Sequence, residues 1–146
     1  MSKIVIPFIK SKLDIPVVSL YINDCRVEAI IDTGSESTLI DKTFAKEHKK
    51  LFHISTHTDK CMYFGFNSST EHPVIIAETV IGFKEKEKAI SIAGEVFNLD
   101  SVISAIKETY DIEPKLIIGS DFLNKFSTEI NYETRQLILM TDDLSC

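Results

Sequence analysis

Long apolar runs are missing from the sequence, and its basic residues form no stripe. The amino terminus, MSKIVIPFIKSKLDIPVV, is interrupted by Pro7, Lys10, Lys12 and Asp14, so it matches neither a signal peptide nor a membrane span. We therefore expect a cytoplasmic protein with no membrane partner. The 16 Lys and Arg residues are mixed with 22 Asp and Glu, for a formal net charge of −6. Because phosphate binding needs clustered cations, nucleic acid is not expected as a partner.

Cysteine is also scarce, and its spacing excludes the usual cysteine chemistry. Cys25, Cys61 and Cys146 are an odd number at scattered positions, with no CxxC pair for a metal or a redox centre. We expect free thiols in a reducing compartment. The four histidines are separated by varied sequence without further ligands nearby, so we expect no metal and no cofactor.

The pattern of apolar residues predicts a mainly β fold with two or three short helices. With 146 residues, 44% of them hydrophobic, the chain can bury one core, so we expect a single domain over residues 1–146. The predicted strands are 4–9, 17–22, 26–31, 61–66, 73–81, 115–118, 126–130 and 136–140. The predicted helices are 42–50, capped by Asp41, then 99–110, and one turn over 120–123, capped by Ser120.

In the stretch AIIDTGSESTLID, residues 29–41, the predicted apolar strand is followed directly by an ionisable residue, Asp32. Two carboxylates held about 3 Å apart cannot both ionise, so one would act as a base for water and the other as a proton donor. Gly34, without a Cβ, lets backbone N–H groups approach the carboxylate. A Thr33 hydroxyl can bond to an equivalent loop opposite, and a Ser35 hydroxyl to the outer oxygen of Asp32. Asp, Thr, Gly and Ser are also common in ordinary turns. These four residues alone therefore leave open whether the segment is a catalytic loop or a structural turn.

Two segments in this order, AIIDTGSESTLI and KLIIGSDFLNKFSTEINYETRQLIL, resemble the retropepsin-like aspartic proteases, the small bacterial relatives of the retroviral proteases. The resemblance covers the chain from about Leu20 to Leu139. It implies a closed acid-protease barrel with Asp32 as the catalytic carboxylate, supported by the loop residues Thr33, Gly34 and Ser35. It further implies that a second signature, Ile117, Ile118 and Gly119, packs behind the loop. By position, the flap candidates are Tyr63, Phe64, Gly65 and Phe66.

The chain departs from the viral pattern in three places. The flap segment FGFNSST holds one glycine, whereas viral flaps are glycine-rich. An extra helical insertion is expected around residues 84–113. Ser120 and Asp121 stand where the viral pattern has arginine and asparagine, and we expect Asp121 to bind N–H groups of a short helix rather than to act as a second catalytic carboxylate.

Only one Asp-Thr-Gly occurs, whereas the chemistry needs two facing carboxylates. We therefore expect a homodimer in which Asp32 of each chain meets the other at a two-fold axis. The expected activity is that of an aspartic endopeptidase acting on extended peptide or protein substrates. The alternative is a non-catalytic peptide-binding or assembly module on the same fold. A phosphoryl-accepting Asp32 is disfavoured, since the second aspartate or lysine pattern of such sites is missing.

Overall fold

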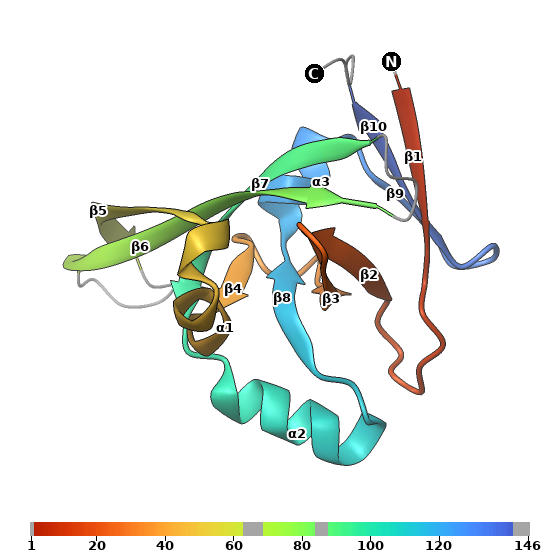
Figure 1. The fold of residues 1–146 in the computed structure, drawn as a ribbon, viewed down its shortest axis with the longest axis horizontal. Coiled ribbons are helices and arrows are strands. Elements are labelled where there is room, and N and C mark those ends of the chain that lie inside the picture. The colour runs from red at the N-terminus through yellow and green to blue at the C-terminus, as the bar shows by residue number, and fades with distance from the viewer. Residues whose placement is uncertain (1, 63–68, 84–87, 142–146) are drawn as a thin grey trace.

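The computed structural model describes residues 2–62, 69–83 and 88–141 (Figure 1). Its strands are β1 (Ser2–Pro7), β2 (Val17–Ile22), β3 (Cys25–Ile31), β4 (Leu39–Asp41), β5 (His53–Met62), β6 (Ser69–Gly82), β7 (Ala89–Phe97), β8 (Pro114–Ile118), β9 (Glu129–Asn131) and β10 (Gln136–Thr141). Its helices are α1 (Lys42–Glu47), the 3-10 turn η1 (Lys49–Leu51), α2 (Asp100–Tyr110) and α3 (Ser120–Lys125). Within these ranges no helix has the length and apolar character needed to cross a bilayer.

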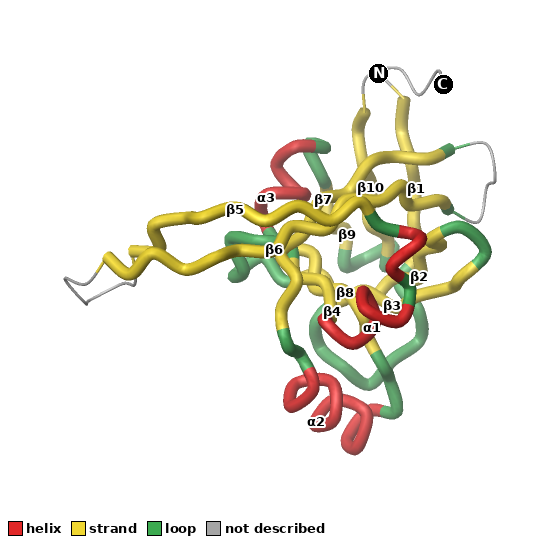
Figure 2. Tube along the Cα trace, turned by 60° about the vertical axis from the view of Figure 1, so that its left-hand side comes forward, coloured by secondary structure: helices red, strands yellow, loops and turns green. Residues whose placement is uncertain are grey.

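Six strands form a closed barrel in the order β2-β3-β8-β4-β7-β6, which confirms the predicted mainly β, closed fold. The barrel closes where β6 pairs with β2, through Tyr21 opposite Gly82 and Ile22 opposite Ile81. Strand β5 pairs with β6, and together they project from the barrel as a long hairpin (Figure 2). A separate sheet, β1-β10-β9, pairs β1 with β10, the first and last strands among the described residues (Figure 1).

The strand that leads to Asp32 begins in a hairpin that the sequence predicts. Ile22 pairs with Cys25, so Asn23 and Asp24 alone form the turn between β2 and β3. Asn23 adopts a φ of 53°, a left-handed conformation that asparagine tolerates better than most residues. The turn therefore fixes the register of β3 against β2.

The last three residues of β3, Ala29 to Ile31, are apolar because this end of the strand is covered on both faces. The strand runs parallel to β8. Parallel strands that are buried on both faces commonly carry consecutive apolar residues. Ile31 joins the main core inside the barrel, while Ile30 packs outside it with Val17 and Ile112. Ile106 of α2 packs against this outer cluster. Helix α2 thus helps to shield the strand that carries Asp32.

Several predicted elements have different bounds. Strand β7 was not predicted, and it lies in the barrel between β4 and β6, so segment 84–113 contributes a barrel strand as well as helix α2. Strand β5 begins at His53 rather than at residue 61, because it pairs along β6. Helix α3 continues to Lys125, so β9 starts at Glu129 instead of residue 126. The predicted Ser120 cap was wrong: Gly119 occupies the N-cap position, without a side-chain hydrogen bond.

Candidate active site

Asp32 is the first residue after β3, and backbone hydrogen bonds hold it in place. Its N–H donates to the Ile118 carbonyl at 2.9 Å, which continues the β3–β8 pairing past the end of both strands. The Gly34 N–H donates to Asp32 Oδ1 at 2.9 Å. The carboxylate is half-buried, and no hydrogen bond reaches its second oxygen, Oδ2, from the described part of the chain. One oxygen is therefore fixed by the loop and the other remains available to a ligand.

The other loop residues differ in their contacts. Thr33 and Gly34 are exposed in the single chain. The Ser35 N–H donates to the Asp32 carbonyl at 3.1 Å, which closes a tight turn. The Ser35 hydroxyl donates to the Ser37 carbonyl at 2.7 Å. Because a hydroxyl has one proton to donate, it does not make the expected bond to Asp32 in this arrangement.

Strand β8 lies directly behind the loop, between β3 and β4. Ile117 pairs with Ile30 on one side and with Leu39 on the other. Gly119 follows at a point of close backbone contact, where a Cβ would lie 2.6 Å from the carbonyl oxygens of both Ser35 and Ser37. Only glycine fits there without moving the backbone of the Asp32 loop.

The start of α3 holds the far end of the loop. The Ser120 N–H donates to the Ser35 carbonyl at 2.7 Å, and the Asp121 N–H to the Glu36 carbonyl at 3.2 Å. The structure thus joins the two sequence motifs, residues 32–38 and 117–121, through backbone contacts. Together the two motifs form one connected unit around Asp32.

A hydrogen-bond network between the exposed Asp121 and the buried Thr38, which the sequence analysis missed, completes this unit. The Asp121 carboxylate accepts hydrogen bonds from the Thr38 N–H at 3.1 Å, the Thr38 hydroxyl at 2.7 Å and the Phe122 N–H at 2.8 Å. The Thr38 hydroxyl in turn accepts from the Gly119 N–H at 3.1 Å. Thr38 is fully buried. Asp121 binds one helix N–H, that of Phe122, where several were expected, and no local sequence signal points to its other partner, Thr38.

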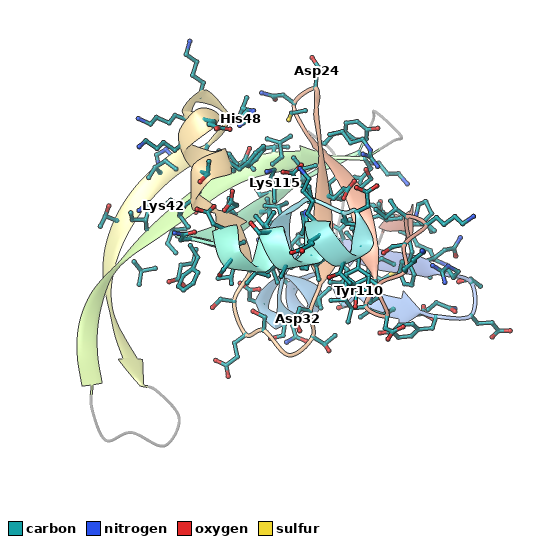
Figure 3. The ribbon with its side chains drawn as sticks, turned by 90° about the horizontal axis from the view of Figure 1, so that it is seen from below. Asp24, Asp32, Lys42, His48, Tyr110 and Lys115 are labelled. Atoms are coloured by element: carbon teal, nitrogen blue, oxygen red, sulfur yellow. The ribbon has the colours of Figure 1, made fainter. Side chains whose placement is uncertain are left out.

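The flap candidates Tyr63, Phe64, Gly65 and Phe66 lie outside the described residues. The arms that lead to them are paired continuously, from His53 opposite Glu78 to Met62 opposite Ser69. In Figure 3, β5 and β6 extend toward the lower side of the view, the side on which the labelled Asp32 lies. Among the described residues, no group of three or more His, Cys, Asp or Glu side chains is placed to hold a metal ion.

Comparison with known proteins identifies the fold. No protein-family model and no curated protein sequence matches the chain. Among solved structures, the retroviral protease-like domain of Ddi1 from Leishmania major aligns with a TM-score of 0.54 and 19% identity, over 88% of this chain and 90% of that one. A retropepsin-like aspartic protease from Rickettsia conorii aligns with a TM-score of 0.51 and 16% identity, over 94% of this chain and 89% of that one. The chain has the retropepsin-like fold.

Proposed function

We propose that the protein is an aspartic endopeptidase that acts as a homodimer. The observation that carries this proposal is the setting of Asp32: a half-buried carboxylate at the end of a barrel strand, with Oδ1 bound by the Gly34 N–H. The retropepsin-like fold of the chain and its likeness to an aspartic protease from Rickettsia conorii support it.

A second carboxylate is needed, and a second copy of the chain is its proposed source. Asp121, the neighbouring candidate, uses both oxygens on Thr38 and Phe122, so it is committed to holding the loop. An isologous dimer would supply Asp32 twice, across one two-fold axis. The exposed Thr33 of each loop would then be free to bond to the opposite loop.

In this dimer the two Asp32 carboxylates share one proton. The ionised carboxylate takes a proton from a water molecule, whose oxygen attacks the peptide carbonyl carbon. The protonated carboxylate gives its proton to the carbonyl oxygen. The tetrahedral intermediate collapses when the carboxyl that took the proton from water gives it to the amide nitrogen, the other carboxylate takes a hydroxyl proton from the intermediate, and the C–N bond breaks. An extended peptide, held by strand-like backbone hydrogen bonds under the β5–β6 hairpin, fits this geometry. No metal or cofactor takes part.

The decisive test is cleavage of a diverse peptide mixture, read by mass spectrometry from about pH 4 to about pH 8. We expect cuts from the wild type and none from Asp32→Asn. The matched control is Asp24→Asn, which removes an exposed carboxylate from the β2–β3 turn, on the opposite side from Asp32 in Figure 3. This control should cleave as the wild type does.

Light scattering on the same samples gives their oligomeric state. Cleavage by a protein that remains monomeric at the assay concentration would contradict the dimer. A folded dimer that cuts nothing at any pH would contradict the enzyme and favour a peptide-binding module on the same fold.

A further inference from the structure

Helix α1 and the turn η1 concentrate positive charge in a protein that is otherwise acidic. Lys42, Lys46, Lys49 and Lys50 are all exposed, and we call them the α1 basic face. Residues 42–50 hold one acidic residue, Glu47, and carry a net charge of +3. Since the whole chain carries −6, the remainder carries −9. The α1 basic face is therefore a local positive surface on a negative molecule.

The scaffold under these lysines is well fixed. The Asp41 carboxylate accepts from the Phe44 N–H at 3.1 Å and caps α1. Phe44 and Ala45 are buried in the core. The Leu51 carbonyl accepts a 2.6 Å hydrogen bond from the Thr79 hydroxyl, which ties η1 to strand β6. The backbone that presents the four lysines is thus held in place before any partner binds.

The lysines themselves do little for the fold. None of the four takes part in an ion pair within the part of the chain that the structure describes. Lys42 and Lys46 are four residues apart on one helix, a spacing at which like charges repel and destabilise the helix slightly. Lys42 and Lys46 therefore lower the stability of the helix slightly, and the four lysines have no ion-pair partner among the described residues. Such a cluster can bind an anion from outside the protein.

Three features favour an acidic protein segment as that anion. The aromatic rings of Phe44 and Phe52 are buried, so they offer no platform on which nucleic-acid bases could stack. The apolar side of α1 packs into the core and is not available for insertion into a membrane. A polyanion longer than the face would also meet the negatively charged remainder of the protein.

The size of the face sets the length of the segment. Lys42 and Lys46 are separated by a rise of roughly 6 Å along α1, at 1.5 Å per residue, and Lys49 and Lys50 continue the face in η1. A short extended peptide, rising about 3.3 Å per residue, covers such a face. We propose that the α1 basic face docks a short, extended acidic segment of another protein. In Figure 3, the labelled Lys42 of the α1 basic face lies well apart from Asp32, so this docking surface is separate from the Asp32 loop.

The test is a binding titration that needs no cleavage, so its outcome is independent of the proposed endopeptidase activity. A fluorescein-labelled tetraglutamate peptide, which offers one carboxylate for each lysine of the α1 basic face, is titrated with the full chain at low salt, and its fluorescence anisotropy is followed. One variant carries Lys→Gln changes at all four positions of the α1 basic face. The matched control changes four other exposed lysines, Lys3, Lys10, Lys12 and Lys125, to Gln and so has the same net charge.

We expect the α1 variant to bind about tenfold more weakly or worse, because four exposed charge pairs of modest energy are lost together. The control should stay within about twofold of the wild type, and added salt should weaken binding by the wild type. Equal weakening in both variants would overturn the proposal, since general attraction would then explain the binding. Tighter binding of single-stranded DNA or of phosphatidylserine vesicles, lost in the α1 variant alone, would also overturn it and assign the face to that ligand.

Discussion

The carboxylate of Asp121 holds both the N–H and the hydroxyl of Thr38, at 3.1 and 2.7 Å, across 83 residues of sequence. This is the side-chain contact that joins the Asp32 loop to helix α3. Asp121 itself is exposed, but because Thr38 is fully buried, water cannot replace a bond that Thr38 or the Gly119 N–H loses there. The precision of the candidate site should therefore depend on residues that never touch a substrate.

Replacement of Thr38 by valine tests this dependence. Thr38→Val keeps the side-chain volume but leaves the Gly119 N–H without its acceptor and Asp121 without one donor. We expect a loss of about 1 to 3 kcal/mol in the free energy of unfolding. Thr38→Ser retains the hydroxyl and should cost about 1 kcal/mol for the missing methyl group. Urea denaturation measures both, and a serine variant as unstable as the valine variant would refute the role of the hydroxyl.

Gly119 should tolerate no side chain. A Cβ there would lie 2.6 Å from two backbone carbonyl oxygens, so Gly119→Ala must displace the loop. We expect it to lower the free energy of unfolding by about 1 to 3 kcal/mol or more. Gly82→Ala is the control, because its nearest neighbour, the Tyr21 carbonyl oxygen, is 3.8 Å away. Thermal unfolding should separate the two variants, and similar midpoints would contradict the close packing at Gly119.

A mixing experiment tests whether one site needs two copies of Asp32. Wild type and Asp32→Asn are combined in equal amounts at constant total concentration and allowed to exchange subunits. If each active site requires both carboxylates, the cleavage rate should fall to about one quarter of the wild-type rate. A fall to about one half would mean that each chain acts by itself, and the dimeric site would be wrong.

Asp41 offers a test of the scaffold beneath α1. Its Oδ2 caps the helix, while Oδ1 is buried and has no hydrogen-bond partner among the described residues. Asp41→Ala removes the cap and should cost about 1 kcal/mol of stability. Asp41→Asn keeps an acceptor for the Phe44 N–H and should lie close to the wild type. Circular dichroism during urea unfolding measures the stability of each variant. An asparagine variant less stable than the alanine variant would contradict the capping role of Asp41.

The sequence predicts those parts of the fold that local patterns determine. Strand β2 matches its predicted bounds, and Asn23 with Asp24 form the predicted turn, because two adjacent residues suffice to specify a hairpin. Strand β7 was missed, since AISIAGEVF contains alanine and glycine, which have low strand propensity. Its pairing with β4 and β6 determines its structure, and no local pattern shows those partners.

The same limit applies to the candidate site. The position of Asp32 follows from an apolar strand that ends at a polar turn, and this is visible in sequence. The hydrogen bond from Thr38 to Asp121 is not visible in the sequence, because the two residues are brought together only when the barrel forms. The direction of the Ser35 hydroxyl was also missed, since the turn carries the Ser37 carbonyl within its reach.

The separation of 83 residues between Thr38 and Asp121 also determines when the site can form during synthesis of the chain. A ribosome that adds about 5 to 20 residues per second needs roughly 4 to 17 s to pass from one to the other. During that interval Asp32 has been synthesised, but Gly119 and α3, which brace its loop, do not yet exist. A nascent chain therefore cannot assemble the site until nearly all of the barrel has been translated, which delays any hydrolytic activity until the fold can complete.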